Sequence, residues 1–205
     1  MTRKLTKEAK ASWCLFIICW IIYAVISMTK SGFSASIVPI VDEGLLTKTD
    51  SGLINAGFYL FYGGAQLIFF KLLDKISPIK LITTVLLGTI VSLVGMSMAQ
   101  NFVSMLILWS FCGLIQFSVW PAVLRLMSEF LLPEHEGFAH VAIAFSYCAG
   151  SLINYLLAAL ILHSATWRVL FLALAAIAIV SLISWFIITT KTVPLLKNAR
   201  ELTED

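Results

Sequence analysis

Long runs without a single Asp, Glu, Lys or Arg constrain this chain more than any other feature. They cover residues 11–29, 31–41, 51–70, 81–124, 138–162 and 169–190. A charge at the centre of a bilayer costs about 2.5–3.5 kcal/mol, so such runs are typical of helices that cross a membrane. Charged residues make up 12% of the chain, whereas soluble domains carry roughly 25%. We therefore exclude a water-soluble domain.

The runs predict an all-α membrane protein with six transmembrane helices. The run 81–124 is too long for one crossing, because about 20 residues at 1.5 Å each span a bilayer. Its polar pair Gln100-Asn101 divides it into a helical hairpin. The segment 163–166 separates the fifth helix from the sixth. The predicted helices follow the runs 11–41, 51–70, 81–99, 102–124, 138–162 and 169–190.

The predicted helices leave only short segments outside the membrane. We expect residues 1–10 to form an amino-terminal tail, residues 11–190 the six-helix bundle, and residues 191–205 a second tail or the start of a linker. Basic residues concentrate on one side of the membrane, which the positive-inside rule places in the cytoplasm together with both termini. That side receives Arg3, Lys4, Lys7, Lys10, Lys71, Lys75, Lys80, Arg125, Lys191, Lys197 and Arg200, and the other receives Lys30, Lys48 and Arg168.

Four of the predicted helices carry a stripe of polar and aromatic residues. Residues three or four positions apart share a helix face. For any one of them, packing between helices is a sufficient explanation, because small and polar residues commonly join membrane helices. Four stripes in one bundle favour a shared aqueous cavity. The stripes are Trp20, Tyr23, Ser27, Lys30 and Ser34; Asn55, Tyr59, Tyr62 and Gln66; Gln116 and Trp120; and Tyr147, Gly150, Ser151 and Asn154.

Lys30 is the most informative charged residue, and its role depends on where the first helix ends. If the helix ends near Thr29, Lys30 lies at the membrane surface and needs no function. If the helix continues through the uncharged segment 31–41, Lys30 lies inside the membrane. A lysine held there is a point charge that binds an anion. The spacing leaves both possibilities open.

Several motifs resemble the major facilitator superfamily. The segment Asp74-Lys75-Ile76-Ser77-Pro78-Ile79-Lys80 is similar to the acidic-basic loop between its second and third helices, with Phe70 where the family has Gly. Trp167-Arg168 at the start of the sixth helix is also typical of it. Gly113-x-x-Gln116-x-x-x-Trp120-Pro121-x-x-x-Arg125 is similar to helix four of the organophosphate:phosphate antiporters, the glycerol-3-phosphate and hexose-phosphate carriers. Glu134-His135-Glu136-Gly137 loosely follows the segment before their fifth helix.

The resemblance implies roles for individual residues. Tyr23 and Lys30 have the spacing of a Tyr and a phosphate-binding Arg in that branch, with Lys in place of Arg. Tyr62 stands twelve residues before Asp74, as a cavity Tyr does in those carriers, and Tyr147 replaces their helix-five His. Helical spacing and the resemblance together give a substrate-binding set of Lys30, Tyr23, Tyr62, Gln66, Gln116, Trp120, Tyr147 and Asn154, and the resemblance implies a cytoplasmic gate of Asp74, Lys75 and Arg125.

The resemblance covers the amino-terminal six of the family's twelve helices, which form two inverted three-helix repeats. It implies a multi-pass cell-membrane transporter, or half of one, for a small organic anion, with organophosphates as one candidate class. Such a carrier works by alternating access between two six-helix halves. The partners implied are the anion, the lipid bilayer, and a second half or a second copy of the chain. A non-transporting membrane sensor and an inactive truncated half are the alternatives.

Enzymatic, metal and nucleic-acid functions have little support in the sequence. In His135-Glu136-x-x-x-His140 the histidines are five residues apart, which places them about 140° apart on a helix and not on one face. Cys14, Cys19, Cys112 and Cys148 lie inside apolar runs as packing residues. No P-loop is present, so we expect an exchanged or co-transported ion as the energy source, no cofactor, and no nucleic-acid partner.

Overall fold

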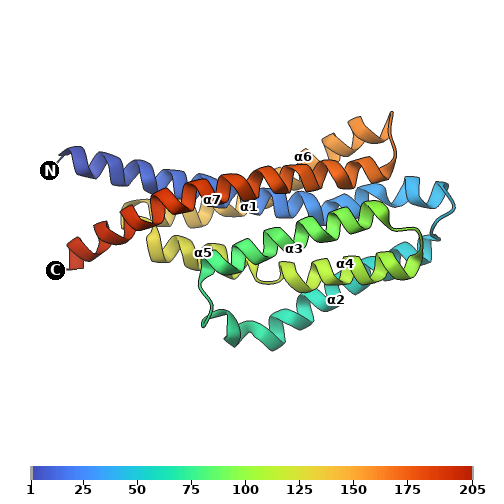
Figure 1. Ribbon diagram of the computed structural model, residues 1–205, viewed down its shortest axis with the longest axis horizontal. Helices are drawn as coiled ribbons and strands as arrows, with labels where there is room; N and C mark the ends of the chain where they lie inside the picture. The colour runs from blue at the N-terminus through green and yellow to red at the C-terminus, as the bar shows by residue number, and fades with distance from the viewer. Residues whose placement is uncertain (1, 205) are drawn as a thin grey trace.

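The computed structural model describes residues 2–204, with side chains described for residues 7–132 and 134–198. The side chains of Arg3, Lys4 and Arg200, which the topology count used, lie outside that set. Across the described residues the chain is entirely helical and turn (Figure 1). The helices are α1 (Thr2–Asp42), α2 (Lys48–Leu73), α3 (Pro78–Met98), α4 (Phe102–Gln116), α5 (Val119–Phe130), α6 (Pro133–Leu162) and α7 (Trp167–Glu204).

These helices form six membrane spans, which confirms the all-α prediction and the number of crossings. Within the described residues, six helical stretches are long and apolar enough to cross a bilayer. The fourth contains both α4 and α5. The spans are Lys7–Asp42, Lys48–Leu73, Pro78–Met98, Phe102–Phe130, Glu134–Leu162 and Trp167–Asn198.

The turns lie where the polar breaks predict them. The α3–α4 hairpin turns at residues 99–101, and the Asn101 side chain accepts a hydrogen bond from the Ser104 amide at 2.9 Å, which caps α4. Thr47 and Asp50 form a capping box at the start of α2. The turn at 163–166 between α6 and α7 is also confirmed.

One feature of the fourth span was not predicted. The helix breaks at Phe117 and Ser118, between α4 and α5. Pro121 explains the break, because a proline has no N–H for the carbonyl four residues earlier, here that of Phe117, and its ring crowds that carbonyl. The span therefore bends at mid-depth, next to Gln116 and Trp120.

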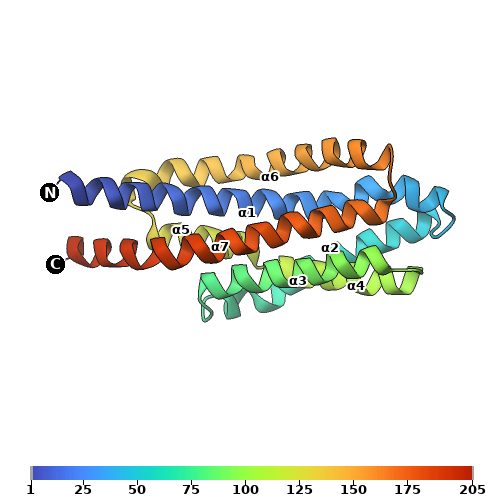
Figure 2. The same ribbon diagram turned by 45° about the horizontal axis from the view of Figure 1, so that its top comes forward.

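Both termini lie at one end of the bundle (Figures 1 and 2). We call this the terminal end; it also holds the α2–α3 and α5–α6 turns. The opposite end, with the α1–α2, α3–α4 and α6–α7 turns, is the loop end. Residues 2–10 and 191–204, expected as tails, continue α1 and α7 as helix.

Packing is organised around α1, the most deeply buried span. It contacts α6 and α7 along its length, while α2 packs on α4 and α3 packs on both α4 and α7. Two glycines permit the closest approaches. A Cβ at Gly113 would collide with the Phe58 carbonyl oxygen across the α2–α4 seam, and one at Gly150 with that of Ala24 across the α1–α6 seam. The motif glycine Gly113 is thus a packing residue.

The apolar core has two parts, one toward each end of the bundle. The terminal-end cluster includes Leu15, Ile22 and Trp185, and the loop-end cluster includes Trp109 and Phe171. Along α1 the first cluster ends at Ile26 and the second begins at Val25, so they meet at mid-depth. The polar residues of interest lie at this level.

Candidate functional site

Lys30 lies inside the first span. Because α1 continues to Asp42, the longer of the two possible helices is the one observed. The half-buried Lys30 ammonium lies 4.3 Å from the centroid of the Tyr62 ring on α2, in cation–π geometry. Among the described residues, no carboxylate lies within 4.0 Å of this ammonium. A positive charge therefore stands inside the membrane with an aromatic face as its neighbour.

Aromatic residues from three further predicted positions gather beside α1. The Tyr23 ring lies 4.8 Å from that of Trp120 on α5 and 6.2 Å from that of Tyr147 on α6, measured between centroids. Tyr147 is 41% exposed and its α2 neighbour Tyr59 is 54% exposed. These residues, with Lys30 and Tyr62, form a surface that we call the open face: Tyr23, Lys30, Tyr59, Tyr62, Trp120 and Tyr147.

The structure places Gln116 elsewhere. Its side chain is fully buried, and its Nε2 donates to Thr29 Oγ1 at 2.9 Å and to Thr89 Oγ1 at 3.1 Å, with Cys112 Sγ at 3.3 Å. It thus joins α1, α3 and α4 as a packing residue. Sequence reasoning missed Thr29 and Thr89, because neither belongs to a polar stripe.

Two other predicted binding residues also lie apart from the open face cluster. Asn154 is completely buried on α6, and both of its amide atoms lack a hydrogen-bond partner. It lies near Gly32 of α1. Gln66 is exposed on α2, one turn beyond Tyr62. Gln66 shares a face of α2 with Tyr62, and among the described residues no hydrogen bond or ring contact joins it to Lys30.

Two further residues of the α1 stripe, Trp20 and Ser27, join α1 to α6. The Trp20 indole N–H donates to the Ala142 carbonyl at 3.2 Å. Ser27 Oγ donates to the Tyr147 carbonyl at 2.6 Å and lies 2.8 Å from Ser151 Oγ. These bonds hold the Tyr147 backbone beside the stripe, so packing and site formation use the same helix face.

Two of the three predicted gate residues, Arg125 and Asp74, meet at the terminal end through the Asp74 backbone carbonyl. Arg125 Nη1 donates to the carbonyls of Leu73, Asp74 and Ile76 at 2.9, 3.2 and 3.0 Å. Its guanidinium thereby satisfies carbonyls left open where α2 ends. The Asp74 and Lys75 side chains are exposed on the turn. Glu129, which sequence reasoning missed, pairs with Arg125 at 2.6 Å; their i, i+4 spacing was the available signal.

A second unpredicted cluster joins the end of α1 to the start of α7 at the loop end. The Glu43 carboxylate, just after α1, accepts a hydrogen bond from the Trp167 indole N–H and pairs with Arg168 at 2.9 Å. These bonds hold the pKa of Glu43 below its ordinary value of 4.5, the Trp167 hydrogen bond having the largest effect. The Trp167-Arg168 motif was recognised from the sequence, whereas its carboxylate partner was not.

Comparison with known proteins identifies the family. The model of the Major Facilitator Superfamily matches residues 19–204. The chain is also similar to the membrane sensor protein UhpC of Salmonella typhimurium, with 25% identity over 174 residues. That alignment covers 83% of this chain and 39% of UhpC, so the chain spans well under half of the relative it matches. The family consists of membrane transporters that bind small molecules, and it is not a family of enzymes. With its family match and its six spans, this multi-pass membrane chain belongs to the major facilitator superfamily.

Proposed function

We propose that the chain supplies one six-helix half of a secondary carrier for small organic anions, a class that includes organophosphates. The observation that carries this proposal is Lys30, a cation inside the first span with no carboxylate partner among the described residues. A charge in that place is costly and marks a substrate or ion pathway. The partner of the Lys30 ammonium would be an anionic substrate, which is bound during only part of the transport cycle.

The groups around Lys30 fit an anion that carries an organic part. The hydroxyls of Tyr23, Tyr62 and Tyr147 are hydrogen-bond donors, and the Trp120 ring offers an apolar surface. Lysine binds phosphate as a point charge, without the two-pronged geometry of arginine. The Lys30 ammonium binds a carboxylate in the same way. The proposed substrate class is therefore organic anions, with organophosphates as one member.

A second six-helix half would complete the cavity. Tyr59 and Tyr147 are about half exposed on α2 and α6, which flank α1. In this family the binding site lies between two halves that alternate in access. The missing half is a further segment, a separate chain or a second copy of this chain, and an exchanged or co-transported ion drives transport.

The helix contacts support two inverted three-helix repeats. The first span packs on the fifth and sixth, the fourth packs on the second and third, and the third packs on the sixth. Exchanging spans one to three with spans four to six leaves this pattern unchanged. The close approaches at Gly150, between the fifth and first spans, and at Gly113, between the fourth and second, lie on seams that this exchange relates, with the glycine on the opposite member of each pair.

The distribution of basic residues supports a cytoplasmic terminal end. The positive-inside rule places the more basic side of a membrane protein in the cytoplasm. The described lysines toward the terminal end are Lys7, Lys10, Lys71, Lys75, Lys80, Lys191 and Lys197. Arg125, Asp74 and Lys75 would then form part of a cytoplasmic gate. In that role Arg125 would keep the α2–α3 turn attached to α5 through its three carbonyl contacts.

Binding to the purified chain in detergent tests the proposed site. We expect glycerol 3-phosphate and succinate to raise the melting temperature, and glycerol to have no effect. Lys30→Ala should weaken binding about tenfold to a hundredfold, since a hydrogen bond to a charged group contributes roughly 1.5–3 kcal/mol. Lys30→Arg should retain binding. Lys80→Ala, which removes an exposed lysine at the start of α3, is the control. Equal binding by Lys30→Ala would overturn the proposal.

A ligand sensor is the second candidate, because the similar protein UhpC is named a membrane sensor. Counterflow in vesicles separates the two functions. A carrier accumulates labelled glycerol 3-phosphate against the unlabelled compound inside, whereas a sensor binds it without exchange. The assay needs the chain together with its second half, and Lys30→Ala should abolish exchange by a carrier.

A further inference from the structure

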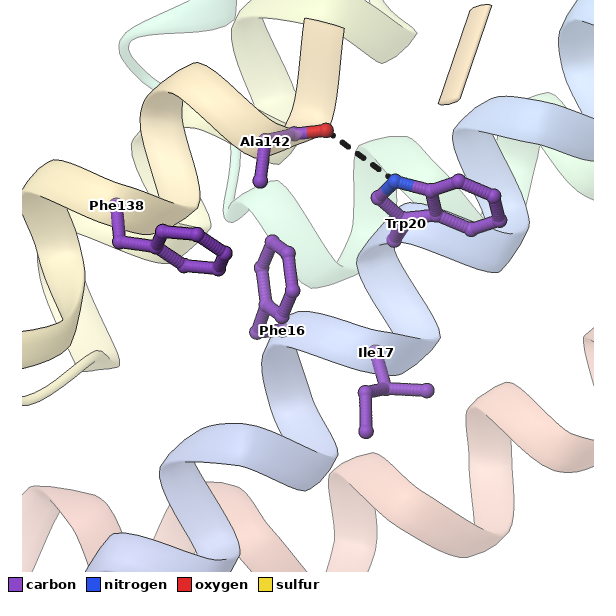
Figure 3. Close-up of a pocket in the computed structure, with 5 residues that line it drawn as sticks. All are labelled: Phe16, Ile17, Trp20, Phe138 and Ala142. Carbon is purple, nitrogen blue, oxygen red and sulfur yellow. Dashed lines mark hydrogen bonds between the residues drawn. The ribbon is translucent and has the colours of Figure 1, made fainter. Parts of the chain in front are cut away.

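The groove between α1 and α6 near the terminal end has a chemistry distinct from that of the open face. It is lined by Phe16, Ile17, Trp20, Phe138 and Ala142 and has a volume of about 270 Å³. Figure 3 shows the Phe16 and Phe138 rings side by side across the groove, and the Trp20 indole N–H bonded to the Ala142 carbonyl. Ile17 is 50% exposed and Phe138 is 61% exposed. This groove lies within two membrane spans, so lipid chains are its natural surroundings.

The charges at the mouth of the groove have opposite signs on its two helices. On α1, Lys10, Trp13 and Ile17 follow steps of three and four and so share a face. On α6, Glu134, Phe138 and Ala142 follow steps of four. Lys10 is exposed, and the Glu134 side chain is 69% exposed. Among the described residues the two do not form an ion pair with each other. Glu134 Oε1 lies 3.7 Å from His135 Nε2, and the exposed carboxylate keeps a second oxygen for another partner.

We propose that this groove binds a phosphatidylethanolamine molecule. An acyl chain lies against Phe16, Ile17 and Phe138, the phosphate contacts Lys10, and the ammonium of the headgroup donates to Glu134. Lys10 lies close to the start of the first span, Lys7–Asp42, so its side chain reaches toward the headgroup level, and Trp13 one turn further on is also half exposed. Phosphatidylglycerol has no ammonium for Glu134, and the choline of phosphatidylcholine has no N–H to donate. The pair of opposite charges therefore selects ethanolamine, independently of the cargo of the open face.

Tryptophan fluorescence offers a direct test, because two of the six tryptophans lie at the groove. Trp13 is 39% exposed and Trp20 lines the groove, while Trp109, Trp167 and Trp185 are fully buried. The sixth, Trp120, is partly buried at the open face and gives a background signal common to all groove variants. Bromine on an acyl chain quenches a tryptophan only on contact. In nanodiscs holding equal mole fractions, we expect dibrominated phosphatidylethanolamine to show about fivefold higher relative binding than the choline and glycerol lipids, as one headgroup charge contact predicts.

Variants assign the effect to the two charges. Glu134→Gln should remove the preference for ethanolamine over choline, and Lys10→Gln should weaken quenching by all three brominated lipids. Lys80→Gln and Glu136→Gln, at the same end of the bundle, are the matched controls and should change nothing. Ala142→Leu, which fills the groove, should reduce quenching by every lipid while circular dichroism confirms an intact helical fold.

Three results would overturn the proposal. Equal quenching by all three lipids would mean that the groove holds bulk lipid without selection. A preference for phosphatidylglycerol would mean that only the basic residues act. An ethanolamine preference that survives Glu134→Gln would place the selecting group elsewhere.

Discussion

The closed seams between helices and the open face around Lys30 contain the same residue types with different environments. Gln116 is fully buried and bonded to two other helices, whereas Gln66 is exposed on α2. Gly113 admits the α2 backbone, whereas a Cβ at Gly63 would meet nothing within 4 Å. The role of a polar or small residue in a membrane helix is therefore not set by its residue type alone. Its role follows from what lies across from it.

The glycine pair should give the largest difference. Gly113→Ala pushes a Cβ against the Phe58 carbonyl and should destabilise the bundle by about 1–3 kcal/mol or more, because backbone cannot yield as a side chain does. Gly63→Ala should be neutral or stabilise by up to about 1 kcal/mol, through helix propensity. Thermal unfolding in detergent measures both. Similar effects of the two substitutions would mean that the α2–α4 seam is not held by close approach.

The glutamine pair should show a smaller contrast of the same kind. Gln116→Ala leaves a cavity and removes a donor from Thr29 and Thr89, so a loss of about 2 kcal/mol is expected. Gln66→Ala should change stability by less than about 0.5 kcal/mol. Unfolding curves for the two variants beside the wild type are sufficient. A larger loss for Gln66→Ala would show that α2 has a partner at that position.

Lys30 should behave in the opposite sense to Gln116. Lys30→Met removes a half-buried charge that has no carboxylate partner among the described residues, so stability should rise by about 1 kcal/mol. Anion binding should be lost in the same variant. Melting temperature measured with and without glycerol 3-phosphate reports both changes. Lower stability without ligand would mean that Lys30 is mainly a structural residue.

The cluster of Glu43, Trp167 and Arg168 at the loop end should make the smallest contribution to stability, and that contribution depends on pH. Because the pKa of Glu43 is depressed in the folded chain, its contribution to stability is present above pH 4.5 and is lost as the pH falls through the lower folded value. Both partners are partly exposed, so a change of a few tenths of a kcal/mol is expected. Unfolding of wild type and Glu43→Gln between pH 6 and pH 3 should converge at the acid end. Curves that stay parallel would contradict the assignment.

Much of the fold was predictable because it follows from local properties of the chain. Charge-free runs fixed six spans, Gln100-Asn101 marked the hairpin, and residues 163–166 marked the last turn. The break at Phe117 and Ser118 also has a local cause in Pro121, although it was not predicted. Helix ends were less accurate, since α1 and α7 extend well into the expected tails.

The site was only partly predictable. Lys30, Tyr62, Tyr23, Trp120 and Tyr147 come together at the open face as expected. Their grouping was expected from helical spacing and from resemblance to the organophosphate carriers. The binding roles of all these residues, and of the gate, remain predictions.

The sequence by itself determined which residues share a face of one helix, how many helices cross the membrane, and the family. Only the tertiary structure decided which faces close against another helix. Periodicity placed Gln116 and Gln66 in equivalent stripes, yet one is buried and the other exposed. Likewise, only the tertiary structure shows that Arg125 donates to backbone carbonyls at the end of α2 and that Glu43 accepts a hydrogen bond from Trp167. The physical reason is that a helix fixes its own geometry through local hydrogen bonds, while its neighbours are chosen by close packing between segments far apart in the chain.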